Sequence, residues 1–121
     1  MKGGFRLEIE ISDKVVAKIM NNSKKLQKIV GIDMARKIIQ RFNELRSAPN
    51  FKDYLDYQIG KPHPLTGNLD NCFGIHLNRN YRLVVKPLAE QLDNNSLKEC
   101  KKIDVKGVVD YHDGKCKWLI P

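Results

Sequence analysis

The feature that most constrains the fold is a pair of alternating segments between Cys72 and Lys86, separated by a short turn-forming centre. Each segment alternates apolar and polar residues, which is typical of the two strands of a β-hairpin. Because cross-strand partners point to the same face of a sheet, matching the two apolar sets fixes the register. The matched pairs are Phe73 with Val85, Ile75 with Leu83, and Leu77 with Tyr81.

This register leaves residues 78–80 (Asn-Arg-Asn) as a three-residue loop, whereas a two-residue loop would mismatch every pair. Such loops need one residue in the left-handed region, which asparagine enters at low cost, so we expect a positive φ here. The polar face of the hairpin places His76 opposite Arg82, and Cys72 opposite Lys86. We therefore expect this face, which carries an imidazole and a guanidinium, to hold the functional site.

The composition is that of one basic globular domain. The 121 residues are 41% hydrophobic and 30% charged, which predicts a single domain over residues 1–121. The first residues lack the apolar run of a signal peptide, no apolar stretch could span a bilayer, and the three cysteines form no Cys-x-x-Cys pair. We therefore expect a reduced, cytoplasmic protein.

The net charge of +8 favours nucleic acid or a ribonucleoprotein as partner, although surface lysines or an acidic protein partner would also explain it.

Periodic patterns predict a strand and then helices in the first half of the chain. Residues 5–11 alternate apolar and charged side chains, as in a half-buried strand. Helical spacing over residues 13–30, capped by Ser12 or Asp13, fits either one bent helix or two short ones. The next helix is expected to start at an Asp33 cap, to end near Ala48, and to carry a core stripe of Ala35, Ile38, Ile39, Phe42 and Leu45.

The second half predicts shorter elements. Residues 51–55 suggest a helical turn, residues 60–68 a rigid loop with two prolines and two glycines, and residues 88–102 an extended connection with one helical turn. Residues 103–112 predict a last strand, and the tail of residues 113–121 is expected to pack back, since its three large apolar groups are costly to expose. The order β-α-α-β-β-β predicts an α+β fold with a largely antiparallel sheet and helices on one face.

Three kinds of chemistry can be weighed from the residues alone. The histidines and cysteines show no ligand spacing, so no metal site is expected, and a lone Cys72 is more commonly buried or idle than nucleophilic. Phosphate chemistry fits better. Arg82 can contact a phosphate bidentately, and Asp110, Tyr111 and His112 bring a carboxylate, a phenol and an imidazole to the end of the last strand. Each also has a structural explanation: an ion-paired Arg82, a core Tyr111, an idle His112.

Several short motifs occur in order from residue 23 to residue 112: Ser23-Lys24-Lys25-Leu26, residues 35–41, residues 44–50, His63-Pro64-Leu65-Thr66-Gly67, Asn80-Tyr81-Arg82-Leu83 and Val108-Val109-Asp110-Tyr111-His112. Together they resemble the RelE/HigB superfamily, and most closely the HigB-type plasmid maintenance system killer proteins. The resemblance implies a RelE-like fold and the toxin of a type II toxin–antitoxin system. Such a toxin is a ribosome-dependent mRNA endonuclease without cofactor, neutralised by a cognate antitoxin, here a HigA-type helix-turn-helix protein.

The resemblance also implies roles for residues at matching positions. Arg82 would stabilise the phosphate charge, and His112 would be the acid–base group. Asp110 and Tyr111 would position His112 or the RNA, and His63 would contribute from the loop. The further RNA-contacting candidates are Lys61, His76, Arg79, Asn80 and Lys86.

The chain departs from the family pattern in two places. Thr66 stands where HigB toxins often have a lysine, so one phosphate-neutralising charge is missing unless Lys61, Arg79 or Lys86 replaces it. The tail of residues 113–121 continues past the point where some relatives stop, and would shield the site or dock the antitoxin. Two alternatives remain open: a ParE-like toxin, which shares the fold but inhibits DNA gyrase by binding, and an inactive nucleic-acid-binding relative.

Overall fold

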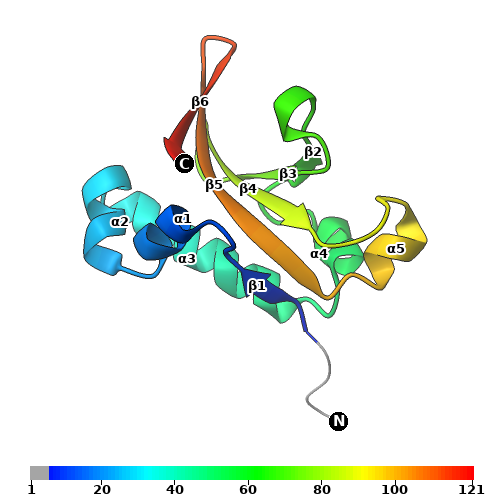
Figure 1. Ribbon diagram of the computed structural model, residues 1–121. Helices are drawn as coiled ribbons and strands as arrows, with labels where there is room; N and C mark the ends of the chain where they lie inside the picture. The colour runs from blue at the N-terminus through cyan, green and yellow to red at the C-terminus, as the bar shows by residue number, and fades with distance from the viewer. Residues whose placement is uncertain (1–5) are drawn as a thin grey trace.

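The computed structural model describes residues 6–121, and a six-stranded sheet forms the centre of this part of the chain (Figure 1). The strand order is β1-β5-β4-β3-β2, and β6 pairs with β5. β1 runs parallel to β5, and the other pairs are antiparallel. The strands are β1 (Glu8–Glu10), β2 (His63–Pro64), β3 (Phe73–His76), β4 (Tyr81–Pro87), β5 (Lys102–His112) and β6 (Lys115–Ile120). The predicted α+β class with a largely antiparallel sheet is confirmed.

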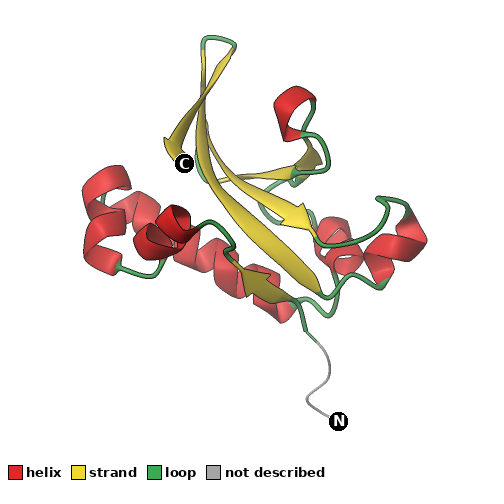
Figure 2. Ribbon diagram, in the orientation of Figure 1, coloured by secondary structure: helices red, strands yellow, loops and turns green. Residues whose placement is uncertain are grey.

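The helices contribute to one core against a single face of the sheet (Figure 2). They are α1 (Lys14–Met20), α2 (Ser23–Val30), α3 (Ile32–Ser47), α4 (Phe51–Tyr57) and α5 (Asn94–Lys98). Among residues 6–121, the opposite face carries a short 3-10 turn, η1 (Gly67–Leu69), and a small apolar cluster of Leu65, Cys72, Val84 and Val109. The element order is therefore richer than β-α-α-β-β-β, because short helices and strands fill segments that the sequence suggested as connections.

Local capping explains how the first helices divide. The Asp13 carboxylate accepts the backbone N–H groups of Val15 and Val16 at 2.9 and 3.0 Å and starts α1. The Asn22 side chain accepts the N–H of Lys25 at 3.1 Å and starts α2, so residues 13–30 form two short helices.

The predicted Asp33 cap is wrong. Gly31, with φ +88°, turns the chain so that α3 begins at Ile32, and Asp33 lies in the first turn, where its charge favours the helix dipole. The predicted core stripe of this helix is buried at every position but one, since Ile39 is exposed.

The hairpin forms in the predicted register. β3 and β4 pair Phe73 with Val85, Ile75 with Leu83 and His76 with Arg82. The expected left-handed loop residue is wrong: within residues 78–80, which the structure describes in full, no φ is positive. The Asn78 side chain closes the loop instead, since its oxygen accepts the N–H groups of Asn80 and Tyr81 at 2.9 and 2.7 Å.

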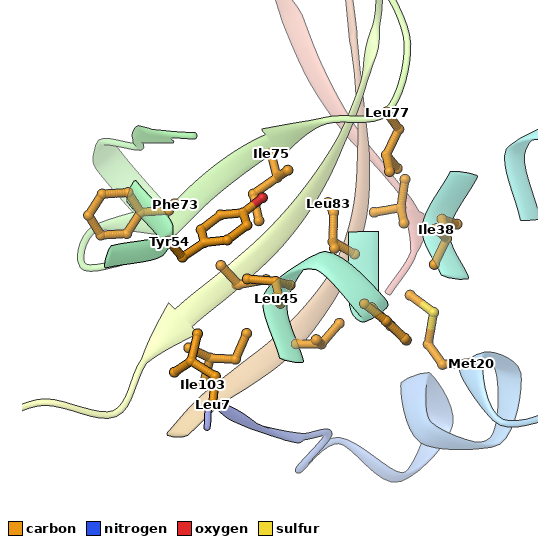
Figure 3. Packing of buried hydrophobic residues seen from close by; sticks show 14 of the residues in the cluster. Leu7, Met20, Ile38, Leu45, Tyr54, Phe73, Ile75, Leu77, Leu83 and Ile103 are labelled. Carbon is orange, nitrogen blue, oxygen red and sulfur yellow. The ribbon is translucent and has the colours of Figure 1, made fainter. Parts of the chain in front are cut away.

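The main core lies between the helices and the sheet (Figure 3). Tyr54 of α4 is fully buried, and its hydroxyl donates to the carbonyl of Ile59 at 2.8 Å. Leu7 is buried next to β1, although β1 is shorter than the predicted residues 5–11, and Phe5 lies outside the described residues.

The tail of residues 113–121 folds back as β6, antiparallel to β5. Ile120 is fully buried in the main core, whereas Trp118 keeps 41% of its surface exposed. Gly107 of β5 permits this approach: its φ is +144°, and a side chain there would collide with the carbonyl oxygen of Ile120. The tail therefore completes the sheet, which the sequence did not predict.

Candidate functional site

A cleft of about 630 Å³ opens on the sheet face opposite the main core. β4 and β5 form its floor, the β2–η1 segment forms one wall, and β6 forms the other. Its lining residues are His63, Pro64, Leu65, Thr66, Asn68, Leu69, Arg82, Tyr111, Cys116 and Trp118. Positive, aromatic and apolar groups thus share one space in the size range of small-ligand sites.

Arg82 is the fixed cation of this cleft. Its Nη1 donates to the carbonyl oxygens of Asn78, Arg79 and Tyr81 at 3.0, 3.2 and 3.0 Å. Burial lowers the pKa of Arg82, but an arginine starts so high that it stays charged. The three carbonyl oxygens hold the guanidinium in position. No ion pair of the described residues involves Arg82, so its charge is not neutralised.

Two histidines lie next to this cation. The rings of His63 and His76 are 5.5 Å apart between centroids and meet edge to face, and His76 is the cross-strand partner of Arg82. The Nδ1 atom of His63 is 3.1 Å from the carbonyl oxygen of Lys61. Because a carbonyl only accepts, this bond places a hydrogen on Nδ1, and in the neutral imidazole Nε2 is then the acceptor. Burial, together with the charge of Arg82, lowers the pKa of His76 below its ordinary value and favours its neutral form.

The lack of a side chain at Gly74 makes room for His63. A Cβ atom at Gly74 would lie 3.2 Å from the Cε1 and Nε2 atoms of His63 and 3.2 Å from Leu65. His63 pairs with Gly74 across β2 and β3, so the imidazole lies over the backbone of β3. The sequence predicted a loop here, and the two-residue strand β2 is what fixes this ring.

Tyr111 joins the floor of the cleft to its β6 wall. It pairs with Cys116 across β5 and β6, and its backbone N–H donates to the carbonyl of Asn80 at 2.8 Å. The guanidinium carbon of Arg82 lies 5.8 Å from the centroid of the Tyr111 ring. Burial and the nearby Cys116 thiol raise the pKa of Tyr111, so its hydroxyl stays protonated and can donate a hydrogen bond.

Asp110 and His112 are not among the residues that line this cleft. Asp110 pairs with Tyr81 and His112 pairs with Lys115, and strand alternation turns both side chains away from the face of Tyr111. The His112 side chain is 69% exposed, and its Nε2 is 3.4 Å from the carboxylate of Asp113. The expectation that Arg82 and His112 share one site is therefore not met. The Oδ1 atom of Asp110 is buried and has no hydrogen-bond partner among the described residues.

The remaining predicted contacts surround the cleft. Lys61 is exposed just before β2, Arg79 is exposed in the hairpin loop, and Asn80 follows it, partly buried. Lys86 lies on the Arg82 face of β4, four residues along, and is half-buried. Thr66 lines the wall at the position where a lysine was expected.

Of the lining residues that carry a polar or aromatic group, sequence reasoning missed three as site candidates: Asn68, Cys116 and Trp118. Asn68 lies in η1, within the segment that was expected to be a rigid loop, and nothing in its residue type marks it as a site residue. The other two had a signal, because residues 115–118 alternate Lys-Cys-Lys-Trp, which is strand spacing.

All three cysteines are free, with Cys72 and Cys100 buried and Cys116 exposed. Within residues 6–121, no three side chains of His, Cys, Asp or Glu are grouped so that they could hold a metal ion. In that same range, the helices are too short or too polar to cross a membrane. The polar and aromatic groups of the cleft are guanidinium, imidazole, phenol, hydroxyl, thiol, amide and indole.

No family model matches the sequence, and no curated protein matches it either. Similar folds occur among solved structures from Staphylococcus aureus. A YoeB–YefM complex is 22% identical at a TM-score of 0.51, covering 93% of this chain and 97% of that one. A heterotetrameric YoeB–YefM toxin–antitoxin complex is 24% identical at 0.51, covering 88% and 98%, and a YoeB dimer is 22% identical at 0.51 with the same coverage. At these identities the similarity shows a shared fold.

Proposed function

We propose that this protein is the toxin of a type II toxin–antitoxin system: a ribosome-dependent mRNA endonuclease that inhibits translation and is neutralised by a cognate antitoxin. The observation that carries the proposal is the cleft, in which Arg82 lies beside Tyr111 and His63 and pairs with no acidic group of the described chain. The shared fold with YoeB supports the class of protein. The sequence motifs favour the HigB-type branch, and with it a HigA-type antitoxin.

The reaction would be RNase-like. The ribose 2′-oxygen attacks the adjacent phosphorus, the bond to the 5′-oxygen breaks, and a 2′,3′-cyclic phosphate forms while the departing 5′-oxygen takes a proton from water to become a 5′-hydroxyl. Arg82 would stabilise the extra negative charge on the phosphate oxygens, because a fixed cation needs no reorganisation as charge develops. His63 would take the 2′-hydroxyl proton at Nε2, and the protonated Tyr111 hydroxyl would donate a hydrogen bond to a phosphate oxygen.

The family resemblance instead assigns the acid–base role to His112, with Asp110 and Tyr111 as its positioning partners. For His112 to act beside Arg82, the β5–β6 turn at Asp113 would have to reorganise on the ribosome. We propose His63 as the acid–base group and treat His112 as its competitor.

The test is induced expression without an antitoxin. We expect growth arrest, and mRNA cut within codons that carries 5′-hydroxyl ends. Arg82→Ala and His63→Ala should each relieve the arrest while the proteins remain folded. Arg36→Ala, which removes an equal charge from the exposed side of α3, is the matched control and should remain toxic. If His112→Ala abolishes cleavage and His63→Ala does not, His112 is the acid–base group, as the family resemblance implies, and our assignment of that role to His63 is wrong.

The separation of Arg82 from His112 favours one second candidate, a ParE-like toxin that acts by binding. Purified protein would then inhibit DNA gyrase supercoiling while cellular mRNA stays intact. A protein that binds RNA but causes neither effect would be an inactive nucleic-acid-binding relative. Either result would overturn the endonuclease proposal.

A further inference from the structure

Trp118 of β6 is the largest aromatic side chain that lines the cleft. The β5–β6 hairpin and the β2–η1 segment both line the cleft, and Figure 1 shows them as two separate projections from the sheet. We propose that Trp118 forms a nucleobase-stacking subsite, in which the base of an RNA nucleotide lies on the indole while Arg82 holds a phosphate of the same strand. RNA as the ligand rests on the proposed function, and the subsite itself rests on the geometry of β6.

The indole is packed at one edge, and part of its surface is exposed. Trp118 pairs with Val109 of β5, and its Cζ3 would lie 3.0 Å from a Cβ atom at Gly107, so the ring packs closely on the glycine backbone. Ile120, two residues further on, is fully buried and anchors the strand. Despite this anchoring, 41% of Trp118 remains exposed. A rigidly held aromatic ring with one open face is what base stacking requires.

The rest of the cleft suits a nucleotide. Its volume of about 630 Å³ is in the range of small-ligand sites. Asn68 and Thr66 line the facing wall with an amide and a hydroxyl, which can bond the edge of a base. The cation at Arg82 lies on the floor between the two walls. Polar edge contacts, a stacking face and a phosphate cation are thus combined in one space.

Trp118 could instead serve only to cover Gly107 and the end of the core. Two variants separate these roles, because Trp118→Phe keeps a stacking ring, whereas Trp118→Leu keeps apolar bulk without one. Tyr57→Ala removes an aromatic ring of similar exposure, 48%, from α4 and is the matched control. Thermal unfolding of each variant shows whether the fold is kept.

The experiment uses the purified full chain and a fluorescein-labelled 2′-O-methyl RNA oligomer, which lacks the attacking hydroxyl and stays intact. Because Trp118 is the single tryptophan, the intrinsic fluorescence of the unsubstituted protein should be quenched as unlabelled oligomer is added. By anisotropy, Trp118→Leu should weaken binding roughly ten- to a hundredfold, the usual range for losing one stacked base. Trp118→Phe should bind within about threefold of the parent, and Tyr57→Ala should bind unchanged.

Unquenched fluorescence at saturation, or a folded Trp118→Leu variant that binds as tightly as the parent, would overturn the subsite. These outcomes are distinct from failure of the endonuclease proposal. A protein that cuts mRNA and tolerates Trp118→Leu in both binding and KM would keep the activity and lose the subsite. A protein that cuts nothing, but needs Trp118 to bind RNA, would keep the subsite and lose the activity.

Discussion

The guanidinium carbon of Arg82 lies 5.8 Å from the centroid of the Tyr111 ring, and this contact joins β4 to β5 on the floor of the cleft. A ring positions a guanidinium without neutralising it, whereas a carboxylate would do both. The charge therefore remains available to an anion, which is the property that a phosphate site needs.

This contact predicts that the ring of Tyr111 matters more than its hydroxyl for placing Arg82. Tyr111→Ala should lower kcat/KM for ribosome-bound mRNA about fivefold beyond Tyr111→Phe, since a partly exposed cation–π contact contributes about 1 kcal/mol. In a double-mutant cycle, Tyr111→Ala should have no larger effect than Tyr111→Phe once Arg82 is alanine, because only the hydroxyl contact is then left to lose. Equal losses from the phenylalanine and alanine variants would show that the hydroxyl carries the effect.

The environment of His76 predicts a pH-dependent stability. Burial and nearby positive charges, chiefly Arg82, lower its pKa in the folded state, whereas the unfolded chain keeps the ordinary value of about 6.5. The unfolded state then binds more protons as pH falls, so this contribution is present above about pH 6.5 and is lost as pH falls through the folded pKa.

Urea unfolding of the parent and of His76→Gln, compared between about pH 5 and pH 8, measures this effect. The parent should lose more stability on acidification than His76→Gln. His112→Gln removes an exposed histidine and is the control, which should follow the parent. Parallel pH curves for the parent and His76→Gln would contradict the prediction.

The approach of β6 to β5 predicts a large cost for a side chain at Gly107. Gly107→Ala would add a Cβ against the carbonyl of Ile120 at a φ of +144°, and should lower the free energy of unfolding by about 2–4 kcal/mol. Gly114→Ala is the control, because Gly114 also has a positive φ, +75°, but open space around its Cα, so about 1 kcal/mol is expected. Similar losses at the two positions would mean that β6 does not pack as described.

The sequence predicted the hairpin well because its apolar residues allow only one matched register, and that register is set by burial of one face. It failed at the loop tip. Asparagine offers both a left-handed backbone and a side-chain acceptor, and the sequence cannot choose between them. Here the Asn78 side chain bonds two backbone N–H groups, which satisfies the loop without a positive φ.

For the candidate site, the sequence predicted Arg82, Tyr111, His63 and His112 together, and the structure places the first three around the cleft and His112 away from it. Consecutive residues of a strand point to opposite faces, so Tyr111 and His112 cannot both face one cleft while β5 stays regular. A family motif shows which residue types are present but not which way their side chains point. That direction is set by the alternation of side chains along the strand. Trp118 was missed because the tail was expected to pack back without a defined partner strand.

Lys86 predicts the salt dependence of RNA binding. It lies on the same face of β4 as Arg82, and each lysine or arginine that neutralises a phosphate of single-stranded nucleic acid contributes about 0.7 to the slope of log K against log salt. Lys86→Ala should reduce this slope by about 0.7 when oligomer binding is measured from about 50 to 200 mM KCl. Lys28→Ala, on the exposed side of α2, should leave the slope unchanged. Trp118→Leu should lower the affinity at every salt concentration without changing the slope, because stacking releases no counterions. A slope that stays constant in Lys86→Ala would remove Lys86 from the RNA path and confine phosphate binding to the cleft around Arg82.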